Sequence, residues 1–264
     1  LLAAFRDTDQ AGAAVSAIIG AGVIPAAIEM MDALAIEAAE AAVACGYPAG
    51  AGAVLIVELD GPAAEVESQF SEVADIIEAN GAFEIRIAAD DAERALFWKG
   101  RKSAFAAVGR ISPDYIVQDG VIPRTALPEV LRRIGDLARE HGVRVANVFH
   151  AGDGNLHPLV LFDDAVEGQA EQAEQVSGAI LDLCIEYGGS ITGEHGVGMD
   201  KAKHMPKMFT DDDLQTMQRV RCAFDPHGIA NPGKIFPTPR LCGEVPGRHR
   251  GARPAPEAGL AEVF

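Results

Sequence analysis

The sequence is short of positive charge: it has 22 Lys and Arg residues against 39 Asp and Glu residues, a formal net charge of −17 and a pI near 4.7. Nucleic acids and anionic membrane surfaces attract basic patches, so this balance argues against both as partners. The longest apolar runs are interrupted by Gly, Pro or acidic residues. The sequence therefore predicts no transmembrane helix.

Cysteines in short paired spacings are also lacking, since Cys45, Cys184, Cys222 and Cys242 are scattered along the chain. This pattern predicts free thiols in a reducing compartment, here the cytoplasm, and argues against a disulfide framework or a zinc knuckle. Neither a G-x-G-x-x-G sequence nor a Walker loop is present. The chain therefore has no nucleotide-binding loop of the usual kind.

An initiator Met, a signal peptide and a basic leader are absent too, and residues 1–5 have the character of a strand already in progress. We therefore expect the chain to be a piece of a longer protein. Apolar spacing and turn residues predict helices at 9–19, 33–44, 63–78, 91–109, 127–140, 165–187 and 211–224, with strands at 23–30, 53–59 and 83–88. This alternation predicts an α+β fold: a ferredoxin-like antiparallel sheet with helices on one face, followed by a C-terminal helical segment.

A β-hairpin is predicted around Asp153-Gly154, because apolar runs lead into this dipeptide and out of it. With these two residues as the loop, His150 and His157 stand directly opposite each other on one face. Their Cβ atoms would then be about 5 Å apart, close enough to share a metal ion. The alternative is that both histidines occupy a polar sheet face near a turn.

A second polar cluster follows at residues 192–198, where glycines flank Glu194 and His195 on both sides. Glycine allows a sharp turn and a close approach of the backbone to a ligand. Glu194 could complete a metal site with the two histidines, and three protein ligands leave the open position of a catalytic site. His195 would then be free as a general base. The alternative is a glycine-rich turn with a solvated Glu–His pair.

Arg101, on the helix predicted at 91–109, is a candidate to bind a substrate carboxylate, because a guanidinium offers a carboxylate two hydrogen bonds. The alternative is a basic residue on an exposed helix surface. Farther along, residues 224–236 form a dense run of turn residues that includes Asn231 and Lys234. After Pro237, Pro, Gly and Arg dominate, which predicts a disordered tail at 238–264.

Three segments together resemble one known family: His150-Ala-Gly-Asp-Gly-Asn-Leu-His157, Gly193-Glu-His-Gly-Val-Gly198, and Phe224-Asp-Pro followed by Asn231-Pro-Gly-Lys234. Their order resembles that in the C-terminal half of the FAD-linked oxidases of the vanillyl-alcohol oxidase/PCMH superfamily. Within this superfamily the likeness is to glycolate oxidase FAD subunits and to D-lactate and D-2-hydroxyglutarate dehydrogenases. The stretch 98–114 also resembles the glycolate oxidase subunits, and the likeness covers about residues 1 to 237.

The resemblance implies a cap domain that lies over the flavin and supplies most of the substrate site. It implies a divalent metal (Zn, Mn or Fe) bound by the residues that match the family motifs, His150, His157 and Glu194. A metal there would act as a Lewis acid on the substrate hydroxyl.

The resemblance also implies roles for four further residues. His195 would take the hydroxyl proton while the α-hydrogen leaves as hydride to FAD, and Arg101 would bind the substrate carboxylate. Asn231 and Lys234 lie in the segment that returns to the flavin in the family. Phe105 stands where some dicarboxylate-specific relatives have a polar residue, which favours glycolate or D-lactate over 2-hydroxyglutarate.

The family's N-terminal half, which surrounds FAD, has no counterpart in the sequence. Because the flavin performs the redox chemistry, we expect the chain to be inactive without an FAD-binding domain, in a longer polypeptide or on a separate subunit. The implied partners are that domain or subunit, an iron–sulfur subunit and a small 2-hydroxy acid. Such partners could also bring a cytoplasmic chain to the inner membrane.

The predicted organisation is a substrate-binding cap at 1–192, a segment at 193–237 that returns to the flavin, and the tail at 238–264. Two other functions stay open: a catalytically silent partner-binding subunit with the cap fold, and a metal-dependent hydrolase in which His195 activates water. The segment 231–234 favours the oxidoreductase, because a hydrolase has no flavin for this segment to contact.

Overall fold

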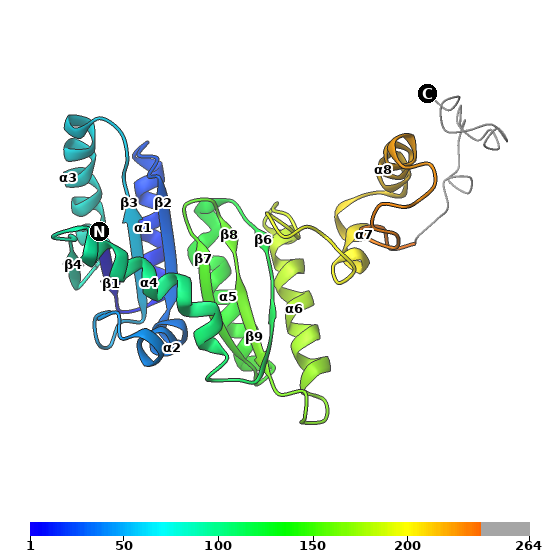
Figure 1. Ribbon diagram of the computed structural model, residues 1–264, viewed down its shortest axis with the longest axis horizontal. Coiled ribbons are helices and arrows are strands. Elements are labelled where there is room, and N and C mark those ends of the chain that lie inside the picture. Colours follow the sequence, from blue (N-terminus) through cyan, green and yellow to red (C-terminus); the bar gives the residue numbers. More distant parts are fainter. Residues whose placement is uncertain (239–264) are drawn as a thin grey trace. The chain divides into compact units, whose positions relative to one another are not determined.

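The computed structural model describes residues 1–238, which form two compact units, one from Leu1 to His195 and one that begins at Gly196 (Figure 1). The predicted tail therefore lies almost wholly outside the described residues, and the predicted domain boundaries stay predictions. The elements of the first unit are β1 (Leu2–Phe5), α1 (Thr8–Gly20), β2 (Ala27–Asp32), α2 (Ala33–Val43), β3 (Ala53–Glu58), α3 (Ala63–Ala79), β4 (Glu84–Arg86), α4 (Asp91–Val108), β5 (Asp114–Val117), β6 (Gly120–Val121), a 3-10 turn (Arg124–Ala126), α5 (Leu127–Glu140), β7 (Arg144–His150), β8 (Asn155–Leu156), β9 (Pro158–Phe162) and α6 (Gln169–Glu186).

The first half of this unit has the ferredoxin-like arrangement that the sequence predicts. The chain runs β1-α1-β2 and then β3-α3-β4, and the strands lie side by side in the order β4-β1-β3-β2 with every pair antiparallel. Along the chain, helix α2 is inserted between β2 and β3. The predicted α+β class and antiparallel sheet are confirmed.

The second half repeats the pattern with interrupted strands. Strands β5 and β6 take the first position, β7 the second, and β8 with β9 the third, while α5 and α6 are the two helices. The fourth position is reduced to one antiparallel bridge, between Val121 and Ser190. The two halves meet edge to edge, because β2 pairs antiparallel with β7, and together they form one nine-stranded sheet.

Helices cover both faces of this sheet, so the prediction of helices on one face is wrong. Helices α1, α3, α5 and α6 pack on one face, and α2 and α4 pack on the other. The physical reason lies in the strands: all four residues of β1 and the first five of β3 are buried. Strands with such unbroken apolar sequences need a cover on each face, whereas alternating strands need only one.

The ladder of paired residues between β2 and β7 has a polar contact at each of its two ends. Glu29 pairs in register with His150, followed by Met30 with Phe149 and Met31 with Val148. At the far end, the Asp32 carboxylate accepts hydrogen bonds from the backbone N–H of Asn147 at 2.8 Å and from its side chain at 2.9 Å. Asp32 also caps α2 through the backbone N–H of Ala35. Buried apolar pairs thus lie between two polar contacts.

The second unit contains a 3-10 turn (Ala202–His204), α7 (Met205–Met208) and α8 (Asp211–Phe224). Helix α8 has the bounds that the sequence predicts, because Thr210 and Asp213 form a reciprocal capping box at its start. The following loop is ordered by the carboxylate of Asp225, which accepts hydrogen bonds from the backbone N–H groups of Ile229 and Ala230.

The cysteine prediction is only partly right. Cys45 and Cys184 are buried and form no disulfide, as predicted, whereas Cys222 is disulfide-bonded, so the expectation that all four cysteines are reduced is wrong. Cys242 lies outside the described residues. Among residues 1–238, none of the helices combines the length and the apolar character that crossing a membrane would require.

The pH dependence of stability should report the buried carboxyl of Asp32. Burial raises its pKa from 3.8 to about 6, against the opposing effect of its hydrogen bonds to Ala35 and Asn147. The folded state therefore favours the protonated form of Asp32. The stabilisation that the protonated form contributes to the free energy of unfolding is lost as the pH rises through about 6. The difference amounts to about 3 kcal/mol.

We expect the free energy of unfolding of the wild type to fall by about 2 kcal/mol more between pH 4 and pH 7 than that of Asp32→Asn, because asparagine does not titrate and at pH 4 part of the difference has already been lost. Urea denaturation of both proteins at the two pH values measures this difference. The contributions of the other carboxyl groups cancel, because both proteins contain them. Parallel changes in the two proteins would contradict the prediction.

Candidate functional site

The candidate site forms where two neighbouring strands of the second half are interrupted. Gln118 and Asp119 separate β5 from β6, and His157 separates β8 from β9. The two interruptions lie next to each other, since the backbone N–H of Gln118 donates to the carbonyl of Pro158 at 3.1 Å. Pro158 has no N–H to continue the ladder. The interruption therefore brings the buried side chains of Asp119 and His157 to one place.

The hairpin that carries the histidines has a different register from the predicted one. His150 pairs with Asn155, so the loop has four residues, 151–154, and the predicted pairing of His150 with His157 is wrong. A two-residue turn of the favoured type needs positive φ at both residues, and only Gly154 of the dipeptide has it, at +72°. The loop is bound from outside the hairpin, because Gly154 accepts a hydrogen bond from Ile122 N–H and Gly152 donates one to Ile28.

The two imidazoles nevertheless meet, with ring centroids 5.4 Å apart at an angle of 84°. Each ring has a partner at its Nδ1 atom: Glu29 Oε1 lies 2.8 Å from His150 Nδ1, and the carbonyl oxygen of Gln118 lies 3.2 Å from His157 Nδ1. Both Nε2 atoms are thereby left to face the centre of the site. Imidazoles that bind metals typically have this arrangement, with the distal nitrogen bonded to a carboxylate or carbonyl.

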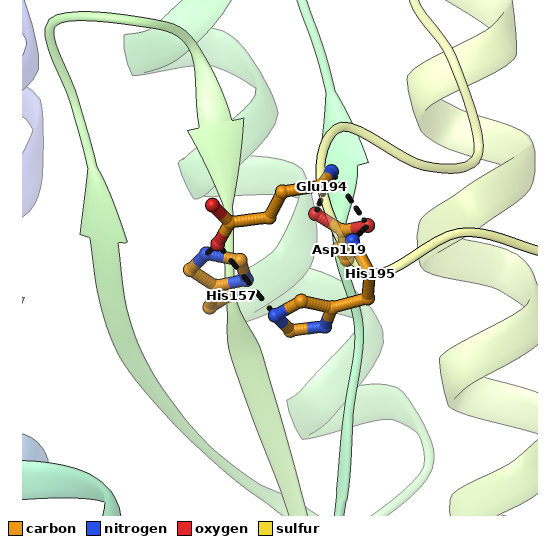
Figure 2. A group of neighbouring side chains, drawn as sticks. All are labelled: Asp119, His157, Glu194 and His195. Atoms are coloured by element: carbon orange, nitrogen blue, oxygen red, sulfur yellow. Dashed lines mark hydrogen bonds and ion pairs between the residues drawn. The ribbon is translucent and has the colours of Figure 1, made fainter.

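Asp119 fixes the loop that carries Glu194 and His195. Its buried carboxylate accepts a hydrogen bond from the Thr192 hydroxyl at 2.6 Å and from the backbone N–H of Gly193 at 3.0 Å. It also accepts hydrogen bonds from the backbone N–H groups of Glu194 and His195, at 3.2 and 2.8 Å (Figure 2). Gly193 is required here by space, because a Cβ atom would lie 2.7 Å from the side chain of Val121. One carboxylate thus sets the course of four consecutive residues.

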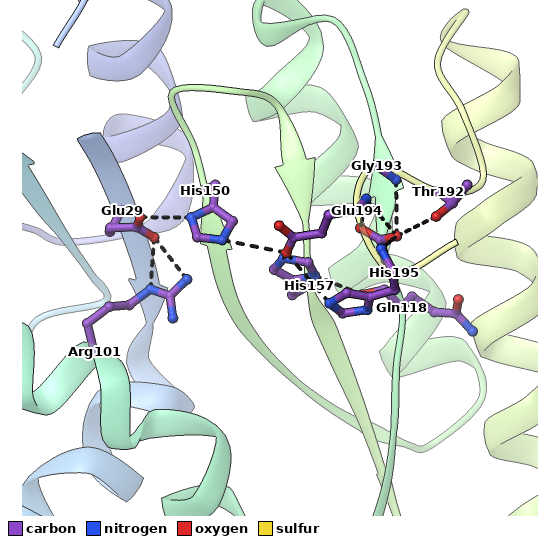
Figure 3. A network of polar contacts seen from close by, with 10 residues as sticks. Glu29, Arg101, Gln118, His150, His157, Thr192, Gly193, Glu194 and His195 are labelled. Carbon is purple, nitrogen blue, oxygen red and sulfur yellow. Dashed lines mark hydrogen bonds and ion pairs between the residues drawn. The ribbon is translucent and has the colours of Figure 1, made fainter. Parts of the chain in front are cut away.

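The loop places the Glu194 carboxylate among three imidazoles. Its Oε1 atom lies 2.8 Å from Nε2 of His157, 3.6 Å from Nε2 of His195 and 3.7 Å from Nε2 of His150 (Figure 3). The His157 and His195 rings stack with centroids 4.9 Å apart. The structure thus brings together all four residues that the sequence predicted around the metal.

The side chains also allow a second set of metal-binding groups. Potential ligand atoms of Asp119, His157, Glu194 and His195 all lie within 4.8 Å of one another. This set shares His157 and Glu194 with the predicted one. Both carboxylate oxygens of Asp119 already accept backbone hydrogen bonds, however, so its geometry is that of a loop anchor.

The protonation of His157 favours a cation in this cluster. The Gln118 carbonyl can only accept, so the hydrogen of a neutral His157 ring is assigned to Nδ1. Burial lowers the pKa of His157, with a smaller opposing effect from Gln118, and so favours the neutral ring. Its Nε2 lone pair then faces another acceptor, the Glu194 oxygen, at 2.8 Å. Two acceptors at this distance repel each other unless they share a proton or a cation binds beside them. The donor set, imidazole nitrogens with a carboxylate, is one that suits a divalent metal.

Arg101 is buried and already has a carboxylate partner inside the chain. Its Nε and one terminal nitrogen both lie 2.9 Å from Glu29 Oε2, and each of the two side chains is 8% exposed. The other oxygen of Glu29 contacts His150, and this hydrogen bond raises the pKa of His150 against the opposing effect of burial. The alternative interpretation, that Arg101 is a basic residue on an exposed helix surface, is therefore wrong.

Phe105, one turn after Arg101 on α4, forms an apolar wall of the site. Its ring meets the His157 ring edge to face at a centroid distance of 6.1 Å, and the Arg101 guanidinium lies 5.7 Å from its centroid. The site is therefore polar at the carboxylates and imidazoles and apolar beside His157.

Sequence reasoning missed Glu29 and Asp119. Glu29 was visible as a single carboxylate inside the apolar run of residues 26–31, a signal that a buried partner exists. Asp119 had no comparable signal, because its partners lie far along the chain. Thr192, for example, is 73 residues away.

Asn231 and Lys234 lie in the second unit, in the loop after α8. Arg221 orders this loop, since its guanidinium donates to the carbonyl oxygens of Ala230, Asn231 and Lys234. Asn231 has a positive φ of 45°. Their proposed contact with a flavin stays a prediction.

Comparison with known proteins gives consistent matches over almost the whole chain. Residues 1–235 match the sequence family described as "FAD linked oxidases, C-terminal domain". The glycolate oxidase subunit GlcD of Escherichia coli strain K12 is 51% identical over 97% of this chain and 52% of its own length. A mitochondrial D-lactate dehydrogenase [cytochrome] of Arabidopsis thaliana is 29% identical over 89% of this chain and 41% of its own length. The chain thus spans about half the length of these curated relatives.

Solved structures support the fold. A 4-ethylphenol oxidase from Gulosibacter chungangensis superposes with a TM-score of 0.64 at 15% identity, over 90% of this chain and 53% of its own. A p-cresol methylhydroxylase with bound substrate superposes with a TM-score of 0.62 at 12% identity, over 89% and 52%. At these identities the likeness concerns the fold alone.

The anchoring role of Asp119 can be measured by amide hydrogen exchange. Asparagine cannot accept hydrogen bonds at its amide nitrogen, so Asp119→Asn loses charge-assisted bonds to the loop, worth about 2–3 kcal/mol in total. We expect exchange at residues 192–195 to become roughly 30- to 100-fold faster. The exposed Asp75→Asn on α3 is the control and should leave these rates unchanged. Equal protection of the loop in both variants would refute the anchoring role.

Proposed function

The chain belongs to the FAD-linked oxidase C-terminal domain family, and from this membership we propose that it is the substrate-binding cap of an FAD-dependent 2-hydroxy-acid oxidoreductase that acts on glycolate or D-lactate. The names of two relatives, a glycolate oxidase subunit and a D-lactate dehydrogenase, support this substrate class. The observation that carries the proposal is the convergence of three imidazole Nε2 atoms on one oxygen of Glu194.

His150, His157 and Glu194 would bind a divalent metal such as Zn, Mn or Fe. The two Nε2 atoms and the carboxylate face one centre, and the outer nitrogens of the histidines are bonded to Glu29 and Gln118. When bound, the metal would supply Lewis-acid polarisation of the substrate hydroxyl and lower its pKa. The protein's part is to fix the ligands and to leave one side of the cluster open: Glu194 and His195 are each 48% exposed at the side chain.

His195 would take the proton of the substrate hydroxyl. Its ring is stacked on His157 and its Nε2 lies 3.6 Å from Glu194 Oε1, so a hydroxyl bound beside Glu194 is within reach of this nitrogen. The backbone N–H of His195 is bonded to Asp119, which limits the movement of the ring relative to the cluster. FAD, when present, would accept the α-hydrogen as hydride.

Arg101 would contribute to binding of the substrate carboxylate. Glu29 uses its Nε and one terminal nitrogen, so the carboxylate would meet the other terminal nitrogen. Phe105 contacts both Arg101 and His157, and its ring offers no polar partner for a second carboxylate. This favours a small monocarboxylate, glycolate or D-lactate, over 2-hydroxyglutarate.

The remaining parts of the enzyme would lie outside the chain. The relatives are about twice as long, so an FAD-binding portion would come from a longer polypeptide or from another subunit. Asn231 and Lys234 would contact the flavin, and an iron–sulfur subunit would be a further partner. We propose a cytoplasmic location, with attachment to the inner membrane through such partners.

Metal binding tests the ligand set directly. We expect His157→Ala to weaken binding of Zn²⁺ or Mn²⁺ at least about 100-fold, because the variant loses a ligand and leaves Glu194 without its nearest neighbour. Isothermal titration of the full chain measures the affinity. His227→Ala, which removes an exposed histidine of the second unit, is the control. An unchanged affinity in His157→Ala would remove this residue from the ligand set.

Anaerobic flavin bleaching tests the base. In a preparation that contains both this chain and its FAD-binding portion, glycolate or D-lactate should reduce the wild-type flavin. His195→Gln should slow this reduction roughly 10²- to 10⁴-fold, because the hydroxyl proton has no acceptor, while the metal content stays at the wild-type level.

Normal reduction in His195→Gln would disprove the assignment of the base. A wild-type flavin that neither substrate bleaches would favour a silent subunit, and ester or amide hydrolysis by the same preparation would favour the hydrolase.

A further inference from the structure

Glu29 connects the helix that carries Arg101 with a histidine of the candidate metal site. It lies on β2 at the junction of the two halves, and its carboxylate has one oxygen 2.8 Å from His150 Nδ1 and the other 2.9 Å from two nitrogens of Arg101 (Figure 3). Glu29 is 6% exposed and Arg101 is 7% exposed. The three side chains thus form a continuous chain of charge-assisted hydrogen bonds with its ion pair buried.

A carboxylate at this position opposes ordinary sheet packing. Its neighbours on β2, Ile28 and Met30, are buried apolar residues of the core. Taking an ion pair out of water is expensive, and apolar side chains of similar volume often stabilise a protein as much or more. Stability alone therefore does not account for the buried ion pair, whereas a role toward His150, which Glu29 contacts, would.

We propose that Glu29 is a positioning residue for His150 and that Arg101 holds the Glu29 carboxylate in place. By accepting the Nδ1–H, Glu29 selects the tautomer whose lone pair is on Nε2 and turns this atom toward Glu194, 3.7 Å away. The inference rests on the proposed function in that His150 is taken as a metal ligand. Arg101 then has a second role besides contact with a substrate carboxylate.

The chain contains a second ion pair, matched in residue types and in position but more exposed, that does not reach the site. Arg94 lies seven residues before Arg101 on α4, two turns away, and pairs with Glu58 on β3, the strand next to β2. The second oxygen of Glu58 accepts a hydrogen bond from the indole of Trp98 at 2.8 Å. Both ion pairs thus connect a strand glutamate with an α4 arginine, but only one of the two contacts a histidine.

Three variants of the full chain separate positioning from a structural contribution. Glu29→Met/Arg101→Met removes the first ion pair without leaving a buried charge unpaired. Glu29→Gln/Arg101→Met restores an uncharged acceptor for His150. Glu58→Met/Arg94→Met removes the matched ion pair and is the control.

The tautomer of His150 is read in metal-free protein from ¹H–¹⁵N correlation spectra of the imidazoles, recorded at a pH high enough that the ring is neutral. We expect the Nδ1–H form in the wild type, in the control and in Glu29→Gln/Arg101→Met, and a mixture of both tautomers in Glu29→Met/Arg101→Met. Retention of the wild-type tautomer in the latter overturns the proposal, as does an equal change in the control.

Titration with Co²⁺, whose visible bands report imidazole coordination, gives the second readout. We expect an affinity about 10- to 100-fold lower in Glu29→Met/Arg101→Met and near the wild-type value in the control. Wild-type affinity in the first variant overturns the proposal. If even the wild type binds no Co²⁺, the proposed metal site fails, and the tautomer measurement alone still decides whether Glu29 positions His150.

Discussion

The short ladder between β2 and β7 is the constraint on which the rest of the first unit depends. It joins two halves of the same βαββαβ pattern into one sheet through three residue pairs, Glu29 with His150, Met30 with Phe149, and Met31 with Val148. The apolar pairs belong to the cores on the two faces, and a buried carboxylate closes each end. Because His150, a proposed metal ligand, is the last residue of β7, the packing that joins the halves also sets the geometry of the candidate site.

The site exists because the two halves are not equivalent. In the first half the strands of the central pair run without a break, as in β3, where the first five residues are buried. In the second half the corresponding strands are interrupted at Asp119 and His157, and polar side chains replace apolar ones at the interruption. Each of these buried groups has a defined partner: Asp119 accepts four donors of one loop, and His157 donates to a backbone carbonyl. Such compensation is what allows polar groups to stay in a low-dielectric interior.

Local features of the sequence predicted much of this structure. Helix α5 was placed at its observed bounds because its apolar residues recur at helical spacing between clear end signals, and the glycine-flanked Glu194-His195 loop indicated a close backbone approach. The hairpin register was not predictable, because backbone groups outside the hairpin, at Ile28 and Ile122, bind the loop. The cover on the second sheet face and the roles of Glu29 and Asp119 likewise depend on residues far along the chain, which local patterns do not report.

The contact between Glu29 and His150 joins residues 121 positions apart, and this separation has a consequence for folding. Each half of the sheet can form from contacts of shorter range, whereas the junction carries the largest loop-closure entropy, which the β2–β7 ladder and the packing of α1 on α5 offset only when both halves are in place. We therefore expect the candidate site to be assembled in the last step of folding and to open first under stress. Binding at the cluster would then couple directly to the cooperativity of the whole first unit, so that a ligand there stabilises the finished sheet against separation of its halves.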